Sequence, residues 1–264
     1  VAISTDGAAP VFGQAIRAKI EALLPIGLKA WAQAARDWRP AVHDNDMLSI
    51  AGADGTAHVR PIVNPSAPHF SAFTAVSPKG FGLLQRDRDF SHYQDDGVYY
   101  DRRPSLWATP SAPLGAGQVR LYTFPTDSEY TDNVCAYWTP AKAARPGSRI
   151  DAAYRLDWTA DRAPAGSNLA IVQAVWRGRG DEAGVERLVI DFAGLPADAK
   201  PELWTDVGNG TIVKKGGYPV LGQAGLYRVA IDIRKSGDRA ADIRVQLRSG
   251  NRAFSEYVHY PIGA

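Results

Sequence analysis

The sequence predicts a mainly β protein that ends in a β-sandwich. Its composition is rich in glycine (25 residues), proline (18), tyrosine (11) and tryptophan (7), which favours short strands joined by turns. Four runs alternate apolar and polar residues and are bounded by Gly, Pro, Asn or Asp: 154–158, 185–191, 227–233 and 243–247. Several short, half-buried strands within about 100 residues are typical of a sandwich of immunoglobulin-like size.

Only one stretch near the start, residues 11–36, has the composition of a helix, with many alanines and leucines. Pro25 and Gly27 interrupt it. We therefore expect two short helices or one kinked helix there.

The chain after residue 38 changes to short apolar runs broken by turns. Runs 48–50 and 58–63 flank an Asp54-Gly55 turn, which predicts a β-hairpin. Further strands are predicted at 81–84, 106–108, 118–124 and 134–138.

Residues 141–148, AKAARPGS, are small, basic and turn-forming, so we place a linker at 141–150. The predicted organisation is a first domain over 1–140, with the helical segment as its lead-in, and a sandwich domain over 151–264.

Composition excludes several functional classes. The 30 basic and 28 acidic residues leave a net charge of +2, too balanced for a nucleic-acid binder that relies on phosphate neutralisation. No apolar run is long enough to span a bilayer, and the first ten residues lack the pattern of a signal peptide. Cys135 is the single cysteine, so no internal disulfide is expected. Scattered histidines and the absence of a phosphate or dinucleotide motif predict no metal and no cofactor.

The stretch Gln85–Asp95, QRDRDFSHYQD, combines acids, arginines, a histidine and a tyrosine without helical or strand periodicity. A solvated, salt-bridged loop is one reading of such a run. The other reading is a functional site, because the apolar run 80–84 resembles a buried strand that delivers the cluster to a strand end.

Two further acidic clusters lie in the same half of the chain. They are Val42–Asp46, VHDND, and Thr126–Asn133, TDSEYTDN. The oxygens of such clusters could bind calcium, although neither cluster continues into the glycine and distal glutamate of an EF-hand loop.

Carboxylates surrounded by aromatic residues are typical of carbohydrate hydrolysis. One acid protonates the leaving oxygen and another activates water. Tyr93 and Trp107 are candidate sugar contacts, although Trp107 and Trp138 both fall on predicted strands and are also candidates for the core. Asp95, Asp96 and Asp101 read as ordinary turn and surface acids.

These motifs closely resemble the osmoregulated periplasmic glucan biosynthesis protein G/D family. The matching segments are Trp38–Pro40, Val42–Asp46, Phe81–Phe90, His92–Asp95, Arg102–Trp107, Pro125–Glu129, Asp132–Asn133 and Ala136–Trp138. The similarity extends from about Trp38 to the C-terminus and is strongest before Trp138.

The resemblance implies a fold, an activity and a location. The fold would be a β-sandwich cleft domain of galactose-mutarotase-like type, here partial, followed by an immunoglobulin-like β-sandwich. The activity would be endo-type hydrolysis of β-1,2-glucan with inversion at the anomeric carbon, or transglycosylation in some members. The location would be the periplasm, with a β-glucan oligosaccharide or polysaccharide as the partner.

The resemblance also implies roles for individual residues. Asp132 would be the general acid, with its pKa raised by burial beside Tyr130, Tyr137 and Trp138. Asp44 would receive the proton of the attacking water through a relay. The implied substrate-binding residues are Asp46, Arg86, Asp87, Arg88, Asp89, His92, Tyr93, Arg103, Trp107 and Glu129. Asp87 and Asp89 are the reserve candidates for catalysis.

The chain departs from the family pattern in its first 36 residues, in Met47 where a glycine is common, and in lacking most of the N-terminal half of the large domain. Two other functional classes therefore stay open. One is a glucan-binding or scaffold protein without turnover, and the other is a structural sandwich whose acidic loops bind calcium.

Overall fold

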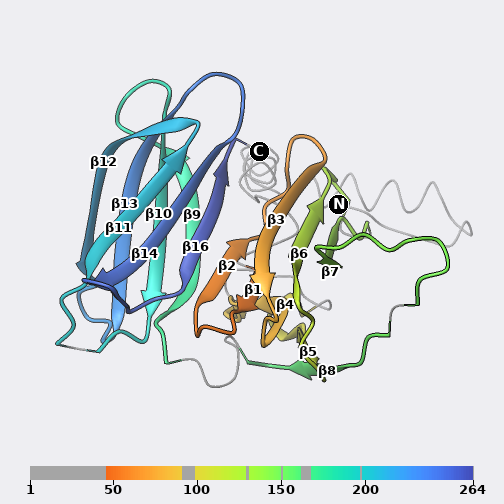
Figure 1. Cartoon of the computed structure of the whole chain (residues 1–264). Helices are drawn as coiled ribbons and strands as arrows, with labels where there is room; N and C mark the ends of the chain where they lie inside the picture. The colour runs from red at the N-terminus through yellow and green to blue at the C-terminus, as the bar shows by residue number, and fades with distance from the viewer. Residues whose placement is uncertain are drawn as a thin grey trace, which may run out of the picture. The chain divides into compact units, whose positions relative to one another are not determined.

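Three β-sheets make up the described part of the chain (Figure 1). The computed structural model describes residues 46–90, 99–128, 131–149, 151–161, 168–196 and 198–263, all within one compact unit, Ala41–Ala264. The regular structure in these ranges is almost entirely β-strand, which confirms the predicted fold class. The helical prediction for 11–36 falls outside the described residues.

The first strands build two of the sheets. In chain order the elements are β1 (Asp46–Ala51), β2 (Ala57–Pro61), β3 (His69–Val76), β4 (Gly80–Gln85), the 3₁₀ helix η1 (Tyr100–Arg102), β5 (Ser105–Pro110), β6 (Ala116–Thr123), β7 (Val134–Pro140) and β8 (Tyr154–Thr159). β1 and β2 form the predicted antiparallel hairpin, in which Gly55 of the turn has φ of 88°, a conformation that glycine adopts without strain. The strands predicted at 81–84, 106–108, 118–124 and 134–138 correspond to β4, β5, β6 and β7.

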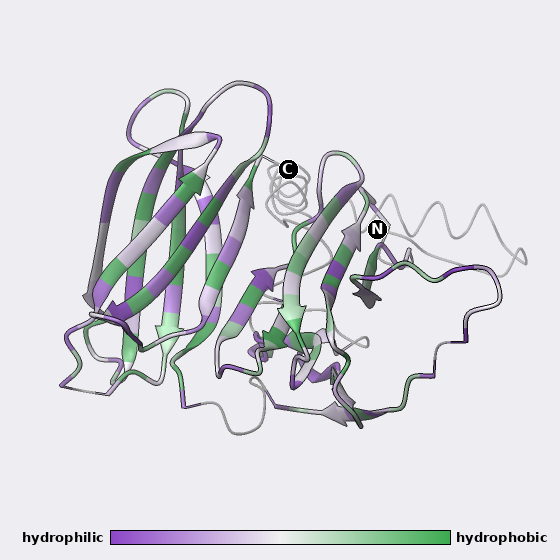
Figure 2. Ribbon diagram, in the orientation of Figure 1, coloured by the Kyte–Doolittle hydropathy of each residue, from purple (hydrophilic) through white to green (hydrophobic). Residues whose placement is uncertain are grey.

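The remaining strands form a sandwich. They are β9 (Ile171–Arg179), β10 (Val185–Ala193), β11 (Glu202–Gly208), β12 (Gly210–Pro219), β13 (Leu226–Lys235), β14 (Ala241–Ser249), β15 (Arg252–Ala253) and β16 (Tyr257–Ile262). The sheet β12-β13-β10-β9 faces the β11-β14-β16 end of the largest sheet. Apolar residues recur at every second position along these strands (Figure 2), because alternate side chains point to the same face.

The core between the two layers is fully buried. Leu188 and Ile190 of β10, Val229 of β13, and Ile243 and Val245 of β14 all belong to one apolar cluster. Burying each such side chain contributes about 1.5–3 kcal/mol. This cluster therefore accounts for the alternation seen in runs 185–191, 227–233 and 243–247.

β16 connects the sandwich to the earlier strands. It pairs antiparallel with β14 and parallel with β2, through Tyr257↔His58 and Val258↔Val59. Met47 and Val59 accordingly lie in the same core cluster as the sandwich. β8, which follows the predicted linker, pairs with β5; the division of the chain at 141–150 stays a prediction.

A smaller sheet, β3-β6-β7, covers the hairpin. Val119 and Leu121 of β6 pack with Leu48 and Ile50 of β1, and Trp138 lies against the same cluster. Trp138, a predicted core residue, is partly buried and packs against this core. This second core fixes the ends of the strands from which the acidic motifs emerge.

Candidate functional site

Asp46 and the start of the charged stretch 85–95 meet where β1 begins and β4 ends. These strands are antiparallel, and Asp46 pairs with Gln85. The end of VHDND and the start of QRDRD are therefore cross-strand neighbours, with Cα atoms roughly 5 Å apart.

Arg88 ties the charged stretch to the segment before β5. Its Nη1 donates to the carbonyls of Asp101 (3.2 Å) and Arg103 (2.9 Å), and its Nη2 donates to Ser105 Oγ (3.3 Å). Ser105 Oγ also accepts the Gln85 amide at 3.1 Å. Hydrogen bonds to charged donors are stronger than neutral ones, so Arg88 holds residues 99–105 beside the end of β4.

The loop between β6 and β7 is closed by two asparagines. Asn64 Oδ1 accepts the Thr126 amide at 3.1 Å, and Asn64 Nδ2 donates to the Thr126 carbonyl at 2.6 Å. Asn133 Nδ2 donates to the Phe124 carbonyl (2.8 Å) and to Asn64 Oδ1 (3.3 Å). The loop that carries Asp132 is thus held at both ends.

Asn64 also relates this loop to the start of β1. The Ile62 amide, two residues before Asn64, donates to the Asp46 carbonyl at 2.8 Å. We use the term acidic edge for the described part of this region: Asp46, Gln85–Asp89, Arg103–Ser105, and the loop segments Phe124–Ser128 and Thr131–Asn133. Strand pairing and side-chain amides bring these segments together although up to 87 positions separate them in the sequence.

Asp132 is exposed at the acidic edge. The burial expected beside Tyr137 and Trp138 is therefore wrong. Both aromatic residues lie within β7, opposite Arg120 and Val119 of β6, and Trp138 packs into the core beneath the sheet. The side chains of a strand point to the two faces of its sheet and not along the strand toward the preceding loop.

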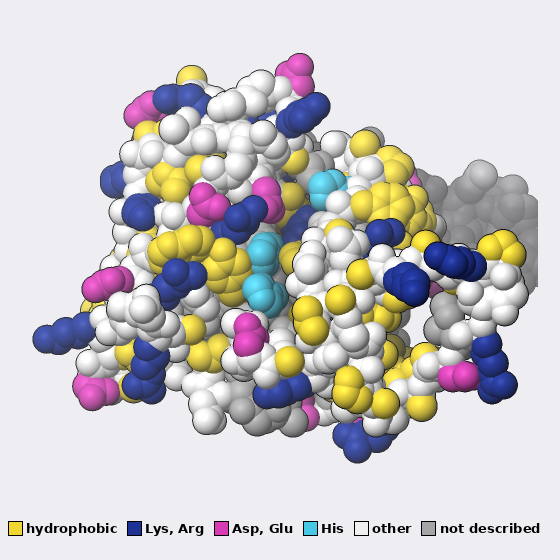
Figure 3. All heavy atoms as spheres, viewed as in Figure 1, with side chains coloured by type: hydrophobic (Ala, Val, Ile, Leu, Met, Phe, Trp, Pro, Cys, Tyr) yellow, Lys and Arg dark blue, Asp and Glu magenta, His cyan; other side chains and the backbone are white. Residues whose placement is uncertain are grey.

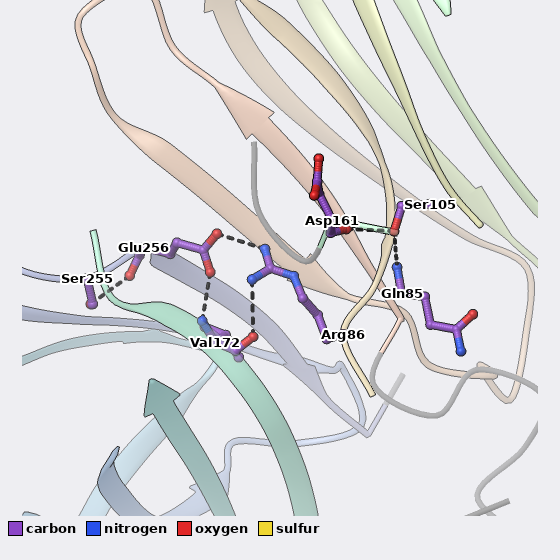
Figure 4. A network of polar contacts seen from close by, with 7 residues as sticks. All are labelled: Gln85, Arg86, Ser105, Asp161, Val172, Ser255 and Glu256. Atoms are coloured by element: carbon purple, nitrogen blue, oxygen red, sulfur yellow. Dashed lines mark hydrogen bonds and ion pairs between the residues drawn. The ribbon is translucent and has the colours of Figure 1, made fainter. Parts of the chain in front are cut away.

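Arg86 points away from solvent into the sandwich. Its side chain and that of Glu256 are both fully buried and form an ion pair of 2.7 Å. Glu256 Oε2 accepts the Val172 amide at 2.7 Å, and Arg86 Nη1 donates to the Val172 carbonyl at 3.3 Å (Figure 4). The geometry gives Arg86 a structural contact between the end of β4 and the strands β9 and β16.

The other described candidates differ in their surroundings. Asp87 is half-buried and caps the amide of the exposed Asp89 at 3.0 Å. Arg103 is exposed and its guanidinium lies 3.7 Å from the Tyr100 ring centroid. Trp107 is half-buried and its indole packs over Gly80 and Gly82. These glycines lie in the first half of β4, and Gln85 is at its other end.

The structure therefore gathers Asp46, Asp87, Arg88, Asp89, Arg103 and Asp132 at one edge, and it directs Arg86 and Trp107 elsewhere. Asp44, His92, Tyr93 and Glu129 fall outside the described residues. The roles assigned to all of these residues stay predictions.

Sequence reasoning missed Asn64. Asn64-Pro65 has only the composition of a turn, and nothing in its neighbourhood indicates a bond to residues 126 and 133. The signal lies in three-dimensional pairing alone, since the interacting residues are 62 and 69 positions apart.

The described residues contain neither a candidate metal site nor a candidate membrane-spanning helix. Among them, no three His, Cys, Asp or Glu side chains are arranged to hold a metal ion. None of the helices found in the same ranges is long and apolar enough to cross a membrane.

Comparison with known proteins gives a consistent result. Residues 29–262 match the model of the family described as periplasmic glucan biosynthesis protein, MdoG. The chain is 39% identical over 235 residues to glucans biosynthesis protein D of Xanthomonas axonopodis pv. citri, covering 83% of this chain and 44% of that protein. It is 39% identical over 243 residues to glucans biosynthesis protein D 2 of Ralstonia nicotianae, covering 86% and 45%.

A third relative extends the comparison. Glucans biosynthesis protein D of Stenotrophomonas maltophilia is 37% identical over 246 residues, covering 86% of this chain and 46% of the relative. The chain thus spans slightly less than half the length of these curated relatives. The match to the family model covers most of the chain, and the chain belongs to the periplasmic glucan biosynthesis protein MdoG family, which places it in the periplasm.

Proposed function

We propose that the chain is the catalytic part of a glucan-active enzyme that hydrolyses β-1,2-glucan at the acidic edge. The proximity of Asp46, the start of QRDRD and the Thr131–Asn133 loop segment at one end of the strands supports this proposal. Family membership supports a role in glucan biosynthesis, and the exposure of Asp132 on a clamped loop gives a sugar direct access to its carboxyl group.

The proposed reaction breaks one glycosidic bond with inversion. Asp132, as the acid, donates its proton to the glycosidic oxygen as the bond to the anomeric carbon breaks. A water molecule attacks that carbon from the opposite face, and its proton passes through a water relay to the Asp44 carboxylate. An inverting pair must be far enough apart to admit this water.

Substrate binding in this proposal uses the polar side chains of the acidic edge. Asp46, Asp87, Asp89 and Arg103 supply carboxylate and guanidinium groups to the hydroxyls of glucose, as do His92, Tyr93 and Glu129. Arg88 holds the segment that carries Arg103 in place through its hydrogen bonds to Asp101, Arg103 and Ser105. Arg86 is left out, because Glu256 and Val172 already occupy its guanidinium.

The test is release of reducing ends from linear β-1,2-glucan. We expect turnover by the wild-type chain and a loss of at least about 100-fold in Asp132→Asn. Asp127→Asn is the matched control, since Asp127 is an exposed aspartate of the same loop. Equal activity of Asp132→Asn and wild type would remove the catalytic assignment.

Two alternatives have specific grounds. Glucan transfer in place of hydrolysis would give elongated products instead of reducing ends in the same assay. Glucan binding without turnover is favoured by the share of the relatives' length that the chain covers, 44% to 46%. Retained binding by calorimetry, with no reducing ends from the wild-type chain, would identify this second alternative.

A further inference from the structure

A concave site separate from the acidic edge lies between β3 and the strands β14 and β16. Its volume is about 740 Å³, within the range of about 300–1,000 Å³ that ligand sites occupy. The lining residues come from the β1–β2 hairpin, β3, β14 and β16. None of the described residues of the acidic edge is among them. We call this site the histidine groove.

Every described histidine lines the histidine groove: His58, His69 and His259. The cyan side chains in Figure 3 gather along this hollow. His58 Nδ1 and His259 Nε2 are 3.1 Å apart and share a hydrogen bond. Burial lowers the pKa of all three rings, that of His259 to about 3. The rings are therefore uncharged at neutral pH, and each has one donor and one acceptor.

Arg60 places a buried cation in the wall of the groove. Only 4% of the residue is exposed. Its Nε donates to Ser71 Oγ at 3.3 Å and its Nη1 to the Pro61 carbonyl at 3.2 Å. Among the described residues, no carboxylate lies within 4 Å of the guanidinium, although Asp242 acts on it electrostatically. A buried guanidinium with donors to spare favours a polar ligand.

The charges of the lining are balanced. Arg60 and Arg244 stand against Asp54 and Asp242, and Arg244 already contacts Asp206 at 3.0 Å and Asp242 at 3.7 Å. An anionic ligand would meet two carboxylates, and a metal ion would meet two arginines. The balance therefore favours an uncharged ligand with many donors and acceptors.

Aromatic rings provide the apolar part of the lining. Tyr257 packs against His58 and against Trp204, with centroids 5.3 and 5.5 Å away. Phe73 contacts the His259 ring edge-on at 5.1 Å, and Phe70 is 63% exposed. Rings beside hydrogen-bonding groups match a sugar, which has C–H faces and hydroxyl edges.

We propose that the histidine groove is a second glucan-binding site, which holds a stretch of the polysaccharide away from the acidic edge. Arg60 and Asp242 bind hydroxyls, and the rings of Phe70 and Tyr257 contact sugar faces. The free edge of β3, which pairs only with β6 among the described strands, adds backbone donors and acceptors. The choice of glucan rests on the proposed function.

The test follows the histidine side chains by NMR during titration with linear β-1,2-gluco-oligosaccharides. We expect saturable shifts of the His58, His69 and His259 ring signals. Asp242→Asn should raise the Kd for these shifts about tenfold, because it removes the charge from a carboxylate that accepts hydrogen bonds from the sugar hydroxyls. Asp206→Asn should leave it within about twofold, because Asp206 also forms an ion pair with Arg244 but does not line the groove.

Asp132→Asn separates this inference from the proposed function. We expect that variant to lose turnover and to keep the histidine shifts. Turnover by the wild-type chain with no histidine shift at saturating oligosaccharide would overturn the groove and leave the enzyme proposal intact. Histidine shifts without any turnover would support the groove and count against the enzyme. Equal affinity in Asp242→Asn and Asp206→Asn would overturn the assigned contacts.

Discussion

Asn64 shows how a single side chain can position a candidate catalytic loop. Its amide contacts Thr126 twice and Asn133 once, while Ile62 nearby is bonded to Asp46. The residue supplies no group that contacts the substrate in our proposal. Its effect on activity is therefore expected to act through Asp132.

Asn64→Ala is expected to loosen the loop that carries Asp132. Leaving the partially buried partners unpaired costs about 1–3 kcal/mol, and a misplaced acid lowers the rate about 10- to 100-fold. Hydrogen exchange should show faster exchange of the Thr126 amide than in wild type. Asn168→Ala, at an exposed asparagine before β9, is the control. An unchanged exchange rate of the Thr126 amide in Asn64→Ala would contradict the proposed role of Asn64 in holding the loop.

The Arg86–Glu256 ion pair should behave as a structural contact. Glu256→Gln leaves the guanidinium buried without its counter-charge, which costs about 3–5 kcal/mol. Urea denaturation is the measurement. Glu182→Gln serves as the control, because its pair with Arg234 is 60% and 48% exposed and contributes less than about 1 kcal/mol. Similar urea midpoints for the two variants would show that the buried ion pair contributes little to the stability of the fold.

At the scale of the strands, β4 and β5 pack closely together at Gly82, and this contact supports the strand that leads to the acidic edge. Gly82 pairs with Trp107 of β5, and a Cβ there would collide with the Leu106 carbonyl and lie 2.9 Å from Trp107 Cα. Glycine in this strand is thus required by packing and not by a turn. β4 then ends at Gln85, where the acidic residues begin.

Gly82→Ala is expected to destabilise the chain by about 1–3 kcal/mol through overpacking. Gly178→Ala on β9 is the matched control, since a Cβ at that position meets no atom within 4 Å. The midpoint of urea unfolding should fall only for Gly82→Ala. A comparable change in both variants would mean that strand propensity, and not the contact with Trp107, is measured.

The strands that sequence reasoning found are those with strong patterns. The Asp54-Gly55 turn has a strong local signal. The alternating runs of β10, β13 and β14 face a continuous core, which produces a readable period of two. β3 was missed, because its sequence HFSAFTAV is half-exposed along its length and gives a weak contrast. β12 was missed as well, since Gly216 and Gly217 interrupt its apolar pattern.

At the scale of the whole molecule, non-local pairing is the part that could not be predicted. β16 lies parallel to β2, and His58 contacts His259 across 201 positions. No local pattern in a single sequence encodes such a partner. The motifs of the acidic edge could be identified from sequence. The role of Asn64 and the histidine groove could not, because both arise from contacts between segments far apart in the sequence.

Acid should weaken the junction between β2 and β16. The folded-state pKa of His58 and His259 lies below the usual 6.5 because of burial, and His58, Arg244 and Arg60 lower that of His259 further, to about 3; Asp54 opposes this for His58. The unfolded chain therefore binds more protons than the folded chain between about pH 6.5 and 3. The free energy of unfolding should fall as the pH decreases through that window.

The measurement is the free energy of unfolding from urea titrations at pH 7.5, 5.5 and 4.5. One pKa unit corresponds to about 1.4 kcal/mol, so we expect a contribution of a few kcal/mol from this pair. His259→Gln should flatten the pH dependence relative to wild type, and His69→Gln should do so less. Identical pH profiles of wild type and His259→Gln would contradict the assignment.

The most direct test of the account is the anomeric form of the first product released from linear β-1,2-glucan, followed by proton NMR. We predict that the wild-type chain releases the α-anomer first and that Asp132→Asn releases none, because an inverting reaction at a β-linkage requires the acid at the acidic edge. Initial release of the β-anomer, or unchanged release by Asp132→Asn, would contradict the proposed mechanism.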